Sequence, residues 1–305
     1  MSKYEVIIIG GGPAGLTAGL YTSRAGLKTL LIERGIFGGQ IVNASQVYNY
    51  PGFPEGVSGF DLASLMHQQA TKYGLETITA EVTAIKPGQT YTILTTEGNF
   101  EAEAAIIAAG SEYRKLGVPG EEKLLGRGVS YCATCDGFLF HDLDVAVVGG
   151  GDTAITDALE LSQHASKVYI IHRRDQLRAG QVLQQQALAR PKLEPVWNAV
   201  VEEIVGDNKV SGLIIRNVKT GEITKLEVAG VFVAIGFEPN SQYFADVVEL
   251  DETGLIKTNE LMATSAPGIF AVGDIRKNSP RQVSSAVGDG ATAALSAFKY
   301  LREKI

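Results

Sequence analysis

Cysteine is nearly absent from this chain of 305 residues, which has only Cys132 and Cys135 and only four histidines. Small secreted domains held by disulfides carry many more cysteines, so that class of protein is excluded. A structural zinc ion takes four cysteine or histidine ligands, and the histidines here are scattered along the sequence. We therefore expect no metal site.

Positive charge and long apolar runs are also scarce. Asp and Glu number 34 against 27 Lys and Arg, and a net charge of −7 argues against nucleic acid as a partner. No apolar run approaches the roughly 18 residues of a membrane-spanning helix. The start, "MSKYEVIIIGGG", has too short an apolar stretch for a signal peptide. We expect a cytoplasmic protein without a membrane partner, whose thiols are mostly reduced.

Glycine, in contrast, is abundant, with 35 residues, and part of it belongs to a pattern that occurs twice. "YEVIIIGGGPAGLTAGLYTSRAGLKTLLIERG" begins at Tyr4, and "LDVAVVGGGDTAITDALELSQHASKVYIIHRRD" begins at Leu143. Each copy has a β-branched run, a glycine-rich turn, an amphipathic helical stretch and a second apolar strand. The repeat predicts an α/β fold with two Rossmann-like dinucleotide-binding domains.

The small residues of the two glycine-rich turns correspond in order: Gly10, Gly12 and Gly15 in the first copy, and Gly149, Gly151 and Ala154 in the second. In such turns the first glycine allows a tight bend and the second lets the backbone approach a pyrophosphate. The third small residue lets the helix pack closely on the strand. One such turn is weak evidence, but two copies in the same context predict two dinucleotide sites.

The two copies differ at the end of their second strand. Glu33 stands where a carboxylate binds the ribose hydroxyls, so the first site should take FAD or NAD. The matching stretch of the second copy, "HRRDQLR", supplies His172, Arg173, Arg174 and Arg178. Guanidinium groups bind a 2′-phosphate by paired hydrogen bonds, whereas a carboxylate would repel it. We expect NADP(H) in the second site, although a solvated strand end would also explain the arginines.

The second copy is interpreted as an insertion in the first domain. Apolar strands that end near Gly110 and Gly236 are each followed by polar, proline-containing sequence suited to a linker. The tail has a strand ending at Asp274 and an alanine-rich helix, but no βαβ unit of its own, so we expect it to complete the first domain. The expected domains are residues 1–114 with 241–305, and the inserted residues 115–240.

The stretch "YCATCDGF" holds both cysteines, and several interpretations of the pair stay open. Half of a zinc site would need two more ligands, and a staple across so short a loop would restrict the unfolded chain little. Two inert buried cysteines are a further alternative. A C-x-x-C pair can cycle between dithiol and disulfide, and the neighbouring Asp136 is suited to exchange protons with it. We favour the redox pair, while Asp136 could also be a turn residue.

Short segments over nearly the whole chain occur in the order of a known family. They are "GGGPAG" at 10–15, "ERG" at 33–35, "GGQI" at 38–41, "NYPG" at 49–52, "CATCDG" at 132–137, "GGGDTA" at 149–154, "HRRDQLRA" at 172–179, "GIFAVGD" at 268–274 and "RQVSSAVGDG" at 281–290. By these segments the chain resembles the low-molecular-weight thioredoxin reductases, which are NADPH-dependent flavoprotein disulfide reductases. "CATCDG" with "HRRxxxRA" is far more specific than either glycine-rich turn.

The resemblance implies a role for each matched residue. It implies that FAD is held by Gly10, Gly12, Gly15, Glu33, Gln40, Asn49, Asp274, Arg281, Gln282 and Val283. It implies that NADPH is held by Gly149, Gly151, Ala154, His172, Arg173, Arg174 and Arg178. In the family the second cysteine faces the flavin and the first attacks the partner, which implies these jobs for Cys135 and Cys132, with Asp136 as the acid and base.

The implied activity is the transfer of electrons from NADPH through FAD and the Cys132–Cys135 disulfide to thioredoxin, in a homodimer. Two alternatives stay open. One is a similar flavoprotein that reduces another disulfide partner. The other is a non-catalytic pyridine-nucleotide redox sensor.

Overall fold

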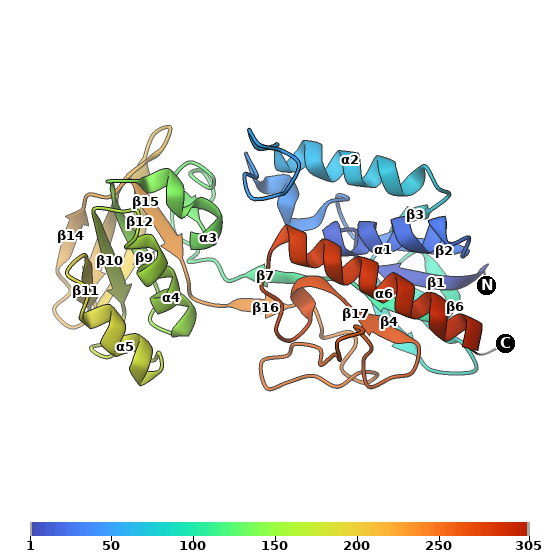
Figure 1. Cartoon of the computed structure of the whole chain (residues 1–305). Coiled ribbons are helices and arrows are strands. Elements are labelled where there is room, and N and C mark those ends of the chain that lie inside the picture. Colours follow the sequence, from blue (N-terminus) through green and yellow to red (C-terminus); the bar gives the residue numbers. More distant parts are fainter. Residues whose placement is uncertain (1, 304–305) are drawn as a thin grey trace. The chain divides into compact units, whose positions relative to one another are not determined.

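The computed structural model describes residues 2–303 and divides the chain into two compact units. Unit 1 consists of Met1–Glu112 and Glu238–Ile305, and unit 2 of Tyr113–Phe237 (Figure 1). The chain passes between them through β7 (Ser111–Tyr113) and β16 (Phe237–Pro239), which pair with each other. The chain thus leaves unit 1 and returns to it at one place.

Unit 1 is built on a seven-stranded sheet of order β3-β2-β1-β6-β5-β4, with β17 also paired to β6. The β1, β2, β3, β6 and β17 strands are parallel to their neighbours, whereas β4, β5 and β6 form an antiparallel series. The bounds are β1 (Ser2–Ile9), β2 (Thr29–Glu33), β3 (Glu76–Thr79), β4 (Val82–Lys86), β5 (Tyr91–Thr95), β6 (Gly98–Ile107) and β17 (Ile269–Ala271).

Helices pack on one face of this sheet. They are α1 (Pro13–Arg24), α2 (Gly59–Thr71) and α6 (Val283–Glu303), and two short 3-10 turns accompany them, η1 (Gly39–Asn43) and η3 (Gly273–Ile275). The α1 and α6 helices approach so closely that a Cβ on Gly290 would lie 2.2 Å from the carbonyl oxygen of Ala14. Alternate strand residues face opposite ways, so Ile8 packs under the helices while Ile7 lies in a second apolar cluster on the other face.

Unit 2 has a five-stranded parallel sheet of order β11-β10-β9-β15-β8 and a separate antiparallel sheet of order β12-β13-β14. The strands are β8 (Val129–Ser130), β9 (Asp144–Val148), β10 (Lys167–His172), β11 (Leu193–Trp197), β12 (Ala199–Gly206), β13 (Val210–Asn217), β14 (Ile223–Leu226) and β15 (Gly230–Val233). The helices are α3 (Ala133–Asp136), α4 (Asp152–Leu161) and α5 (Gln181–Leu188), with a 3-10 turn, η2 (Gly137–Phe140), after α3.

The parallel strands of the two large sheets, with their helices, confirm the fold class predicted from the repeat: each glycine-rich turn joins a strand to a helix in a separate Rossmann-like unit. One expected strand end differs. The strand expected to end at Asp274 stops at Ala271, because Gly273 adopts a φ of 72° and starts η3. Within residues 2–303, no helix is both long and apolar enough to cross a membrane.

Candidate active site

The glycine-rich turn of unit 1 lies between β1 and α1. A Cβ on Gly10, whose φ is 107°, would lie 2.3 Å from the carbonyl oxygen of Ala108, and one on Gly15 would lie 1.9 Å from that of Gly10. Gly12 differs, because a Cβ there would meet nothing within 4 Å. Close packing thus requires Gly10 and Gly15, while the space beside Gly12, at the N-terminus of α1, stays open to an anionic group.

The carboxylate of Glu33 lies at the end of β2 and faces this turn. Its Oε2 accepts a hydrogen bond from the backbone N–H of Gly11 at 2.6 Å, and its Oε1 accepts one from that of Gly35 at 2.8 Å. A pocket of about 70 Å³ adjoins it and is lined by Ile9, Gly10, Ile32, Glu33, Arg34, Ala80, Glu81, Val82, Ala109, Asn240, Gln242, Tyr243 and Phe244. This small pocket sets an oriented carboxylate among apolar and polar side chains.

The remaining unit 1 residues expected at a flavin come from both halves of the discontinuous unit. Asn49 donates a hydrogen bond from its Nδ2 to the Oε1 of Gln282 at 3.0 Å, and Gln40 donates to the backbone oxygen of Ser111 at 3.2 Å. The first contact brings Asn49, which follows η1, beside the start of α6, and the second ties η1 to β7. Val283 is the first residue of that helix.

Asp274 lies in η3 and is mostly buried. Burial raises the pKa of its carboxyl group, and this effect is partly opposed by a hydrogen bond from the Ser279 hydroxyl at 3.2 Å and by the nearby charge of Arg281. A buried carboxylate with such an environment can accept a hydrogen bond from a ligand hydroxyl.

A buried ion pair fixes the turn that carries Asp274. Asp289 of α6 accepts hydrogen bonds from Arg276, at 2.6 Å from Nε and 2.8 Å from Nη2, and from the backbone N–H of Gly273 at 3.0 Å. The side chains of Arg276 and Asp289 are only 14% and 8% exposed. The pair therefore ties both ends of η3 to α6.

The glycine-rich turn of unit 2 repeats the geometry of the first. A Cβ on Gly149 would lie 2.3 Å from the carbonyl oxygen of Ala234 and 2.7 Å from the Cβ of Ala154. A Cβ on Gly151 would meet nothing within 4 Å, as at Gly12 in unit 1. The N-terminus of α4 begins at this open position.

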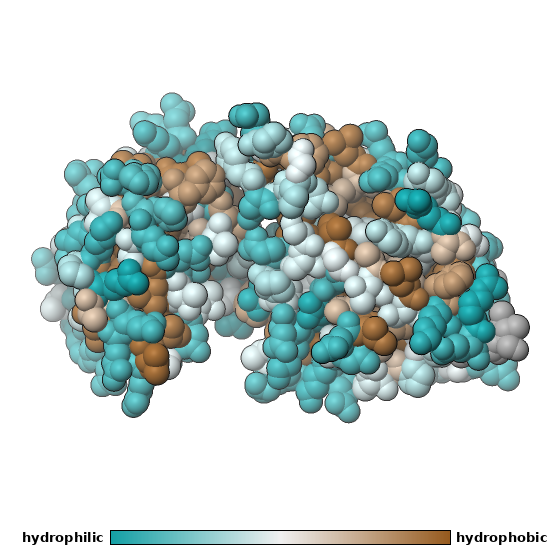
Figure 2. All heavy atoms as spheres, viewed as in Figure 1, coloured by the Kyte–Doolittle hydropathy of each residue, from teal (hydrophilic) through white to brown (hydrophobic). Residues whose placement is uncertain are grey.

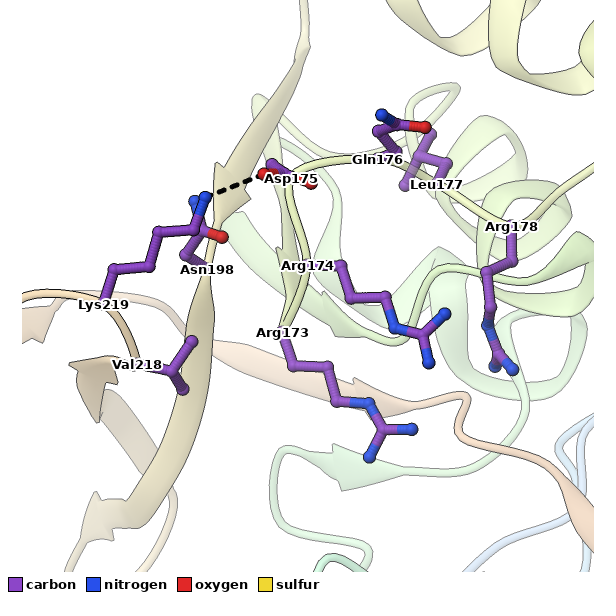
Figure 3. A pocket seen from close by; sticks show the side chains of 9 residues that line it. All are labelled: Arg173, Arg174, Asp175, Gln176, Leu177, Arg178, Asn198, Val218 and Lys219. Atoms are coloured by element: carbon purple, nitrogen blue, oxygen red, sulfur yellow. Dashed lines mark hydrogen bonds and ion pairs between the residues drawn. The ribbon is translucent and has the colours of Figure 1, made fainter.

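A pocket of about 430 Å³ lies at the end of β10 and contains the predicted arginine cluster. Arg173, Arg174 and Arg178 line it, and Figure 3 shows their three guanidinium groups extending toward one region. The backbone N–H of Arg178 donates to the carbonyl oxygen of Gly150 at 2.6 Å, which joins the arginine loop to the glycine-rich turn. The three exposed cations and the open turn thus belong to one surface.

The opposite wall of this pocket comes from residues that the sequence analysis missed. Asn198, Val218 and Lys219 line it, and two successive backbone hydrogen bonds link Val218 through Asn198 to the arginine loop. Asn198 N–H donates to the oxygen of Arg174 at 3.1 Å, and Val218 N–H donates to the oxygen of Asn198 at 2.7 Å. Lys219 pairs with Asp175 at 2.7 Å, and in Figure 3 that carboxylate points away from the guanidinium groups. No local motif marks these positions, because they lie in the turns that follow β11 and β13.

His172 is not brought into the pocket. Its ring is only 4% exposed and lies behind the glycine-rich turn, where a Cβ on Gly150 would be 2.3 Å from its Nδ1. Burial lowers the pKa of this imidazole, and the neighbouring arginines lower it further. The structure therefore gives His172 a packing position at the end of β10.

Cys132 and Cys135 are joined by a disulfide, with their Cα atoms 5.3 Å apart. Cys132 caps the N-terminus of α3, where its Sγ accepts a hydrogen bond from the backbone N–H of Cys135 at 3.1 Å. Both residues are partly exposed. The pair sits at a helix N-terminus, which stabilises a thiolate when the disulfide is reduced.

Asp136 follows at the end of α3. Burial raises the pKa of its carboxyl group, and a hydrogen bond from the Ser130 hydroxyl to its Oδ2, at 2.5 Å, partly opposes this effect. A carboxyl group with a raised pKa holds its proton closer to neutral pH. The sequence analysis did not identify Ser130 as a site residue, although it stands only two residues before Cys132.

The α4 helix packs against α3 and brings two more carboxylates nearby. Glu160 accepts a hydrogen bond from the hydroxyl of Thr134, between the two cysteines, at 2.9 Å. Burial, and then the charge of Glu160, raises the pKa of Asp157 to about 7. In the described part of the chain, no group of three or more His, Cys, Asp and Glu could hold a metal ion.

Comparison with known proteins defines the class. A family model described as pyridine nucleotide-disulphide oxidoreductase matches residues 4–290. The chain belongs to this family of disulfide oxidoreductases.

Individual relatives carry a more specific name than the family as a whole. Thioredoxin reductases of Listeria monocytogenes and Bacillus subtilis are each 47% identical to the chain over 302 residues, which is 98% of this chain and 94% and 95% of theirs. The crystal structure of thioredoxin reductase from Streptococcus pyogenes is 46% identical, covers 99% of both chains and has a TM-score of 0.96. The resemblance inferred from the motifs is confirmed.

Proposed function

We propose that this chain is an NADPH-dependent flavoprotein that reduces the disulfide of thioredoxin through Cys132 and Cys135. The observation that carries the proposal lies in unit 2, where the disulfide at the N-terminus of α3 and the arginine-lined pocket occur in one Rossmann-like unit. The names of the relatives supply thioredoxin as the partner.

Unit 1 is proposed to hold FAD, and its residues fit that group. The open space beside Gly12 suits the pyrophosphate, and Glu33 suits the adenosine ribose. Asp274 offers a buried acceptor for a hydroxyl of the ribityl chain, and the hydrogen bond from Asn49 to Gln282 holds Asn49 beside the start of α6. When bound, the flavin accepts two electrons from a nicotinamide and can pass them to a disulfide.

Unit 2 is proposed to hold NADPH. The pyrophosphate fits the open position beside Gly151, and the 2′-phosphate fits the guanidinium groups of Arg173, Arg174 and Arg178. Asp175, the carboxylate in this pocket, is paired with Lys219 and so repels the phosphate less. These features favour NADPH over NADH.

The cysteine chemistry needs a proton as well as electrons, because NADPH, one proton and a disulfide give NADP⁺ and two thiols. The Cys132 thiolate attacks one sulfur of the partner disulfide, which breaks that S–S bond and forms a mixed disulfide. The departing partner thiolate takes a proton, and we assign its supply to Asp136, whose raised pKa supports this role. The Cys135 thiolate then attacks Cys132 Sγ, which reforms the enzyme disulfide and releases the second partner thiolate.

We also propose a homodimer, as the resemblance implies, and a cytoplasmic location, as the sequence analysis predicts. Exposed apolar side chains on the helical face of unit 1 support self-association: Phe60 and Leu65 on α2 are 62% and 51% exposed, and Leu295 on α6 is 60% exposed. Figure 2 shows apolar side chains on this face among mostly hydrophilic neighbours.

The test measures NADPH oxidation by the purified yellow protein with and without oxidised thioredoxin. Steady turnover that depends on thioredoxin supports the proposal. Cys132→Ser and Cys135→Ser should each abolish turnover while NADPH still bleaches the flavin, since that step needs no cysteine. Both variants reducing thioredoxin at the wild-type rate would refute a redox role for the pair. Flavin reduction with no turnover on any disulfide would instead indicate a redox sensor.

A further inference from the structure

The hydroxyl of Ser130 lies between the disulfide segment and the carboxyl group of Asp136. Its Oγ accepts a hydrogen bond from the backbone N–H of Cys132 at 3.1 Å and donates to Asp136 Oδ2 at 2.5 Å. Ser130 is only 5% exposed and belongs to β8, where it is paired in register with Phe232 of β15. A sheet strand therefore holds this hydroxyl in place.

The same hydroxyl has a second acceptor within reach. The backbone oxygen of Cys132 lies 3.3 Å from Ser130 Oγ, with geometry suited to a hydrogen bond. A serine hydroxyl carries one hydrogen and can accept two hydrogen bonds, and its hydrogen can rotate between acceptors. When Asp136 is ionised, Ser130 donates to it. When Asp136 is protonated, Ser130 can donate to the Cys132 oxygen and accept the O–H of Asp136.

We propose that Ser130 is a positioning residue whose rotating hydroxyl keeps Asp136 hydrogen-bonded in both of its protonation states. This inference rests on the proposed function, in which Asp136 supplies a proton to sulfur. If the buried carboxyl group lost its hydrogen-bond partner in one protonation state, the free energy of that state would rise and proton exchange would slow. With Ser130 present, Asp136 can give up and regain its proton without losing its hydrogen bond.

The charged neighbours of this group come from several elements. The α4 helix, which packs on α3, supplies Asp157 and Glu160, and the cysteines lie on α3 itself or at its cap. On the other side of the segment, the Tyr131 hydroxyl donates to Glu121 at 2.9 Å. The hydroxyl of Ser130 donates to the carboxylate of Asp136, and this hydrogen bond lowers the pKa of that group against the larger opposing effect of burial.

Two measurements on the flavin-loaded full chain test the inference. The first is the pH dependence of single-turnover reduction of thioredoxin by enzyme reduced beforehand with NADPH. The second is the ¹³C chemical shift of the Asp136 carboxyl group as a function of pH, in protein labelled at the Asp carboxyl carbon. The Asp136 signal is assigned by its loss in Asp136→Asn. The second measurement needs no activity.

Ser130→Ala removes the partner of both forms of Asp136, and the ionised form loses more because a hydrogen bond to a charged group is stronger, so the pKa of Asp136 should rise by about one unit. The limb of the pH profile that reports Asp136 should move by the same amount. Ser130→Thr keeps a hydroxyl on a strand-compatible side chain and should restore the wild-type midpoint to within about 0.3 unit.

Three outcomes overturn the inference: an unchanged Asp136 titration in Ser130→Ala, an equal shift in Ser130→Thr and Ser130→Ala, or a shift to lower pH. Failure of the proposed function looks different. In that case Asp136→Asn keeps the wild-type rate and pH profile, while the carboxyl titration in Ser130→Ala still reports whether the hydroxyl controls Asp136.

Discussion

Coenzyme selectivity should depend on the guanidinium groups of Arg173 and Arg178. Replacing both with Gln keeps side chains of similar polarity but removes two cations from the pocket beside the unit 2 turn. A hydrogen bond to a charged group contributes about 1.5–3 kcal/mol, and both arginines are exposed, so the lower value applies to each. That is about a tenfold loss for each arginine, and about 50-fold for the pair if the two losses are less than additive.

Lys219 provides a matched control, because it lines the same pocket but pairs with Asp175. Lys219→Met also removes one positive charge. At a separation of about one Debye length, roughly 8 Å at physiological salt, two unit charges in water interact by ~0.5 kcal/mol before screening. Against a phosphate of about two charges, and with screening, the loss should be about twofold.

The assay measures the KM of NADPH and of NADH for each variant by flavin-dependent turnover, with dissociation constants from fluorescence titration as a check. Arg173→Gln/Arg178→Gln should raise the KM of NADPH about 50-fold and leave the KM of NADH within about twofold of the wild-type value, because NADH has no 2′-phosphate. Equal losses for both nucleotides would show that the arginines serve the fold and would refute the reasoning.

Three further results are expected. Asp157→Asn should have the Tm of the wild type near pH 4 and a Tm increasingly above it up to pH 7. The folded pKa of Asp157, about 7, lies above the ordinary 3.8, so the wild type loses stability as the pH rises through that window. A Tm difference in calorimetry that does not depend on pH would contradict this. Asp289→Asn should lower the free energy of unfolding of unit 1 by about 3–5 kcal/mol and reduce its flavin content, because it leaves the Arg276 charge buried without a partner. Arg276→Met/Asp289→Leu should recover most of the stability and of the flavin content. Equal losses of stability in the single and double variants would argue against the ion pair. Leu65→Glu on α2 should convert a dimer to a monomer in light scattering with turnover measured in parallel, and an unchanged mass would place the contact elsewhere.

The sequence was most informative where chemistry depends on residues close together in the chain. The glycine-rich turns are recognisable because Gly10 and Gly149 must each take a positive φ next to a carbonyl oxygen, which a side chain would contact. The arginines cluster in one loop after β10, so their pocket could be anticipated from spacing alone. His172 belongs to the same motif, yet its ring lies behind Gly150, because the direction of a side chain at a strand end depends on tertiary packing.

Contacts made across the sheet could not be read from local patterns. Lys219 reaches the arginine pocket only because β13 and β12 bring the turn after Asn217 beside Asn198. Asp289 joins Arg276 through the packing of α6 against η3, and no periodicity in α6 marks this one carboxylate as buried. Ser130 stands only two residues before Cys132, but a single serine in a sequence indicates no role until the structure shows the two partners of its hydroxyl.

The pairing of β7 with β16 has a consequence for how the chain acquires its structure during synthesis. Tyr113 and Phe237 begin and end unit 2, and Arg114 N–H donates to the oxygen of Gly236 at 3.0 Å, so the ends of this continuous segment lie together. Unit 1, in contrast, still lacks β17 and α6 when residue 237 leaves the ribosome. Because domains fold as units in order of synthesis, the inserted unit can complete its core first. The earlier half of unit 1 must wait, with the face of its sheet that α6 later covers still exposed.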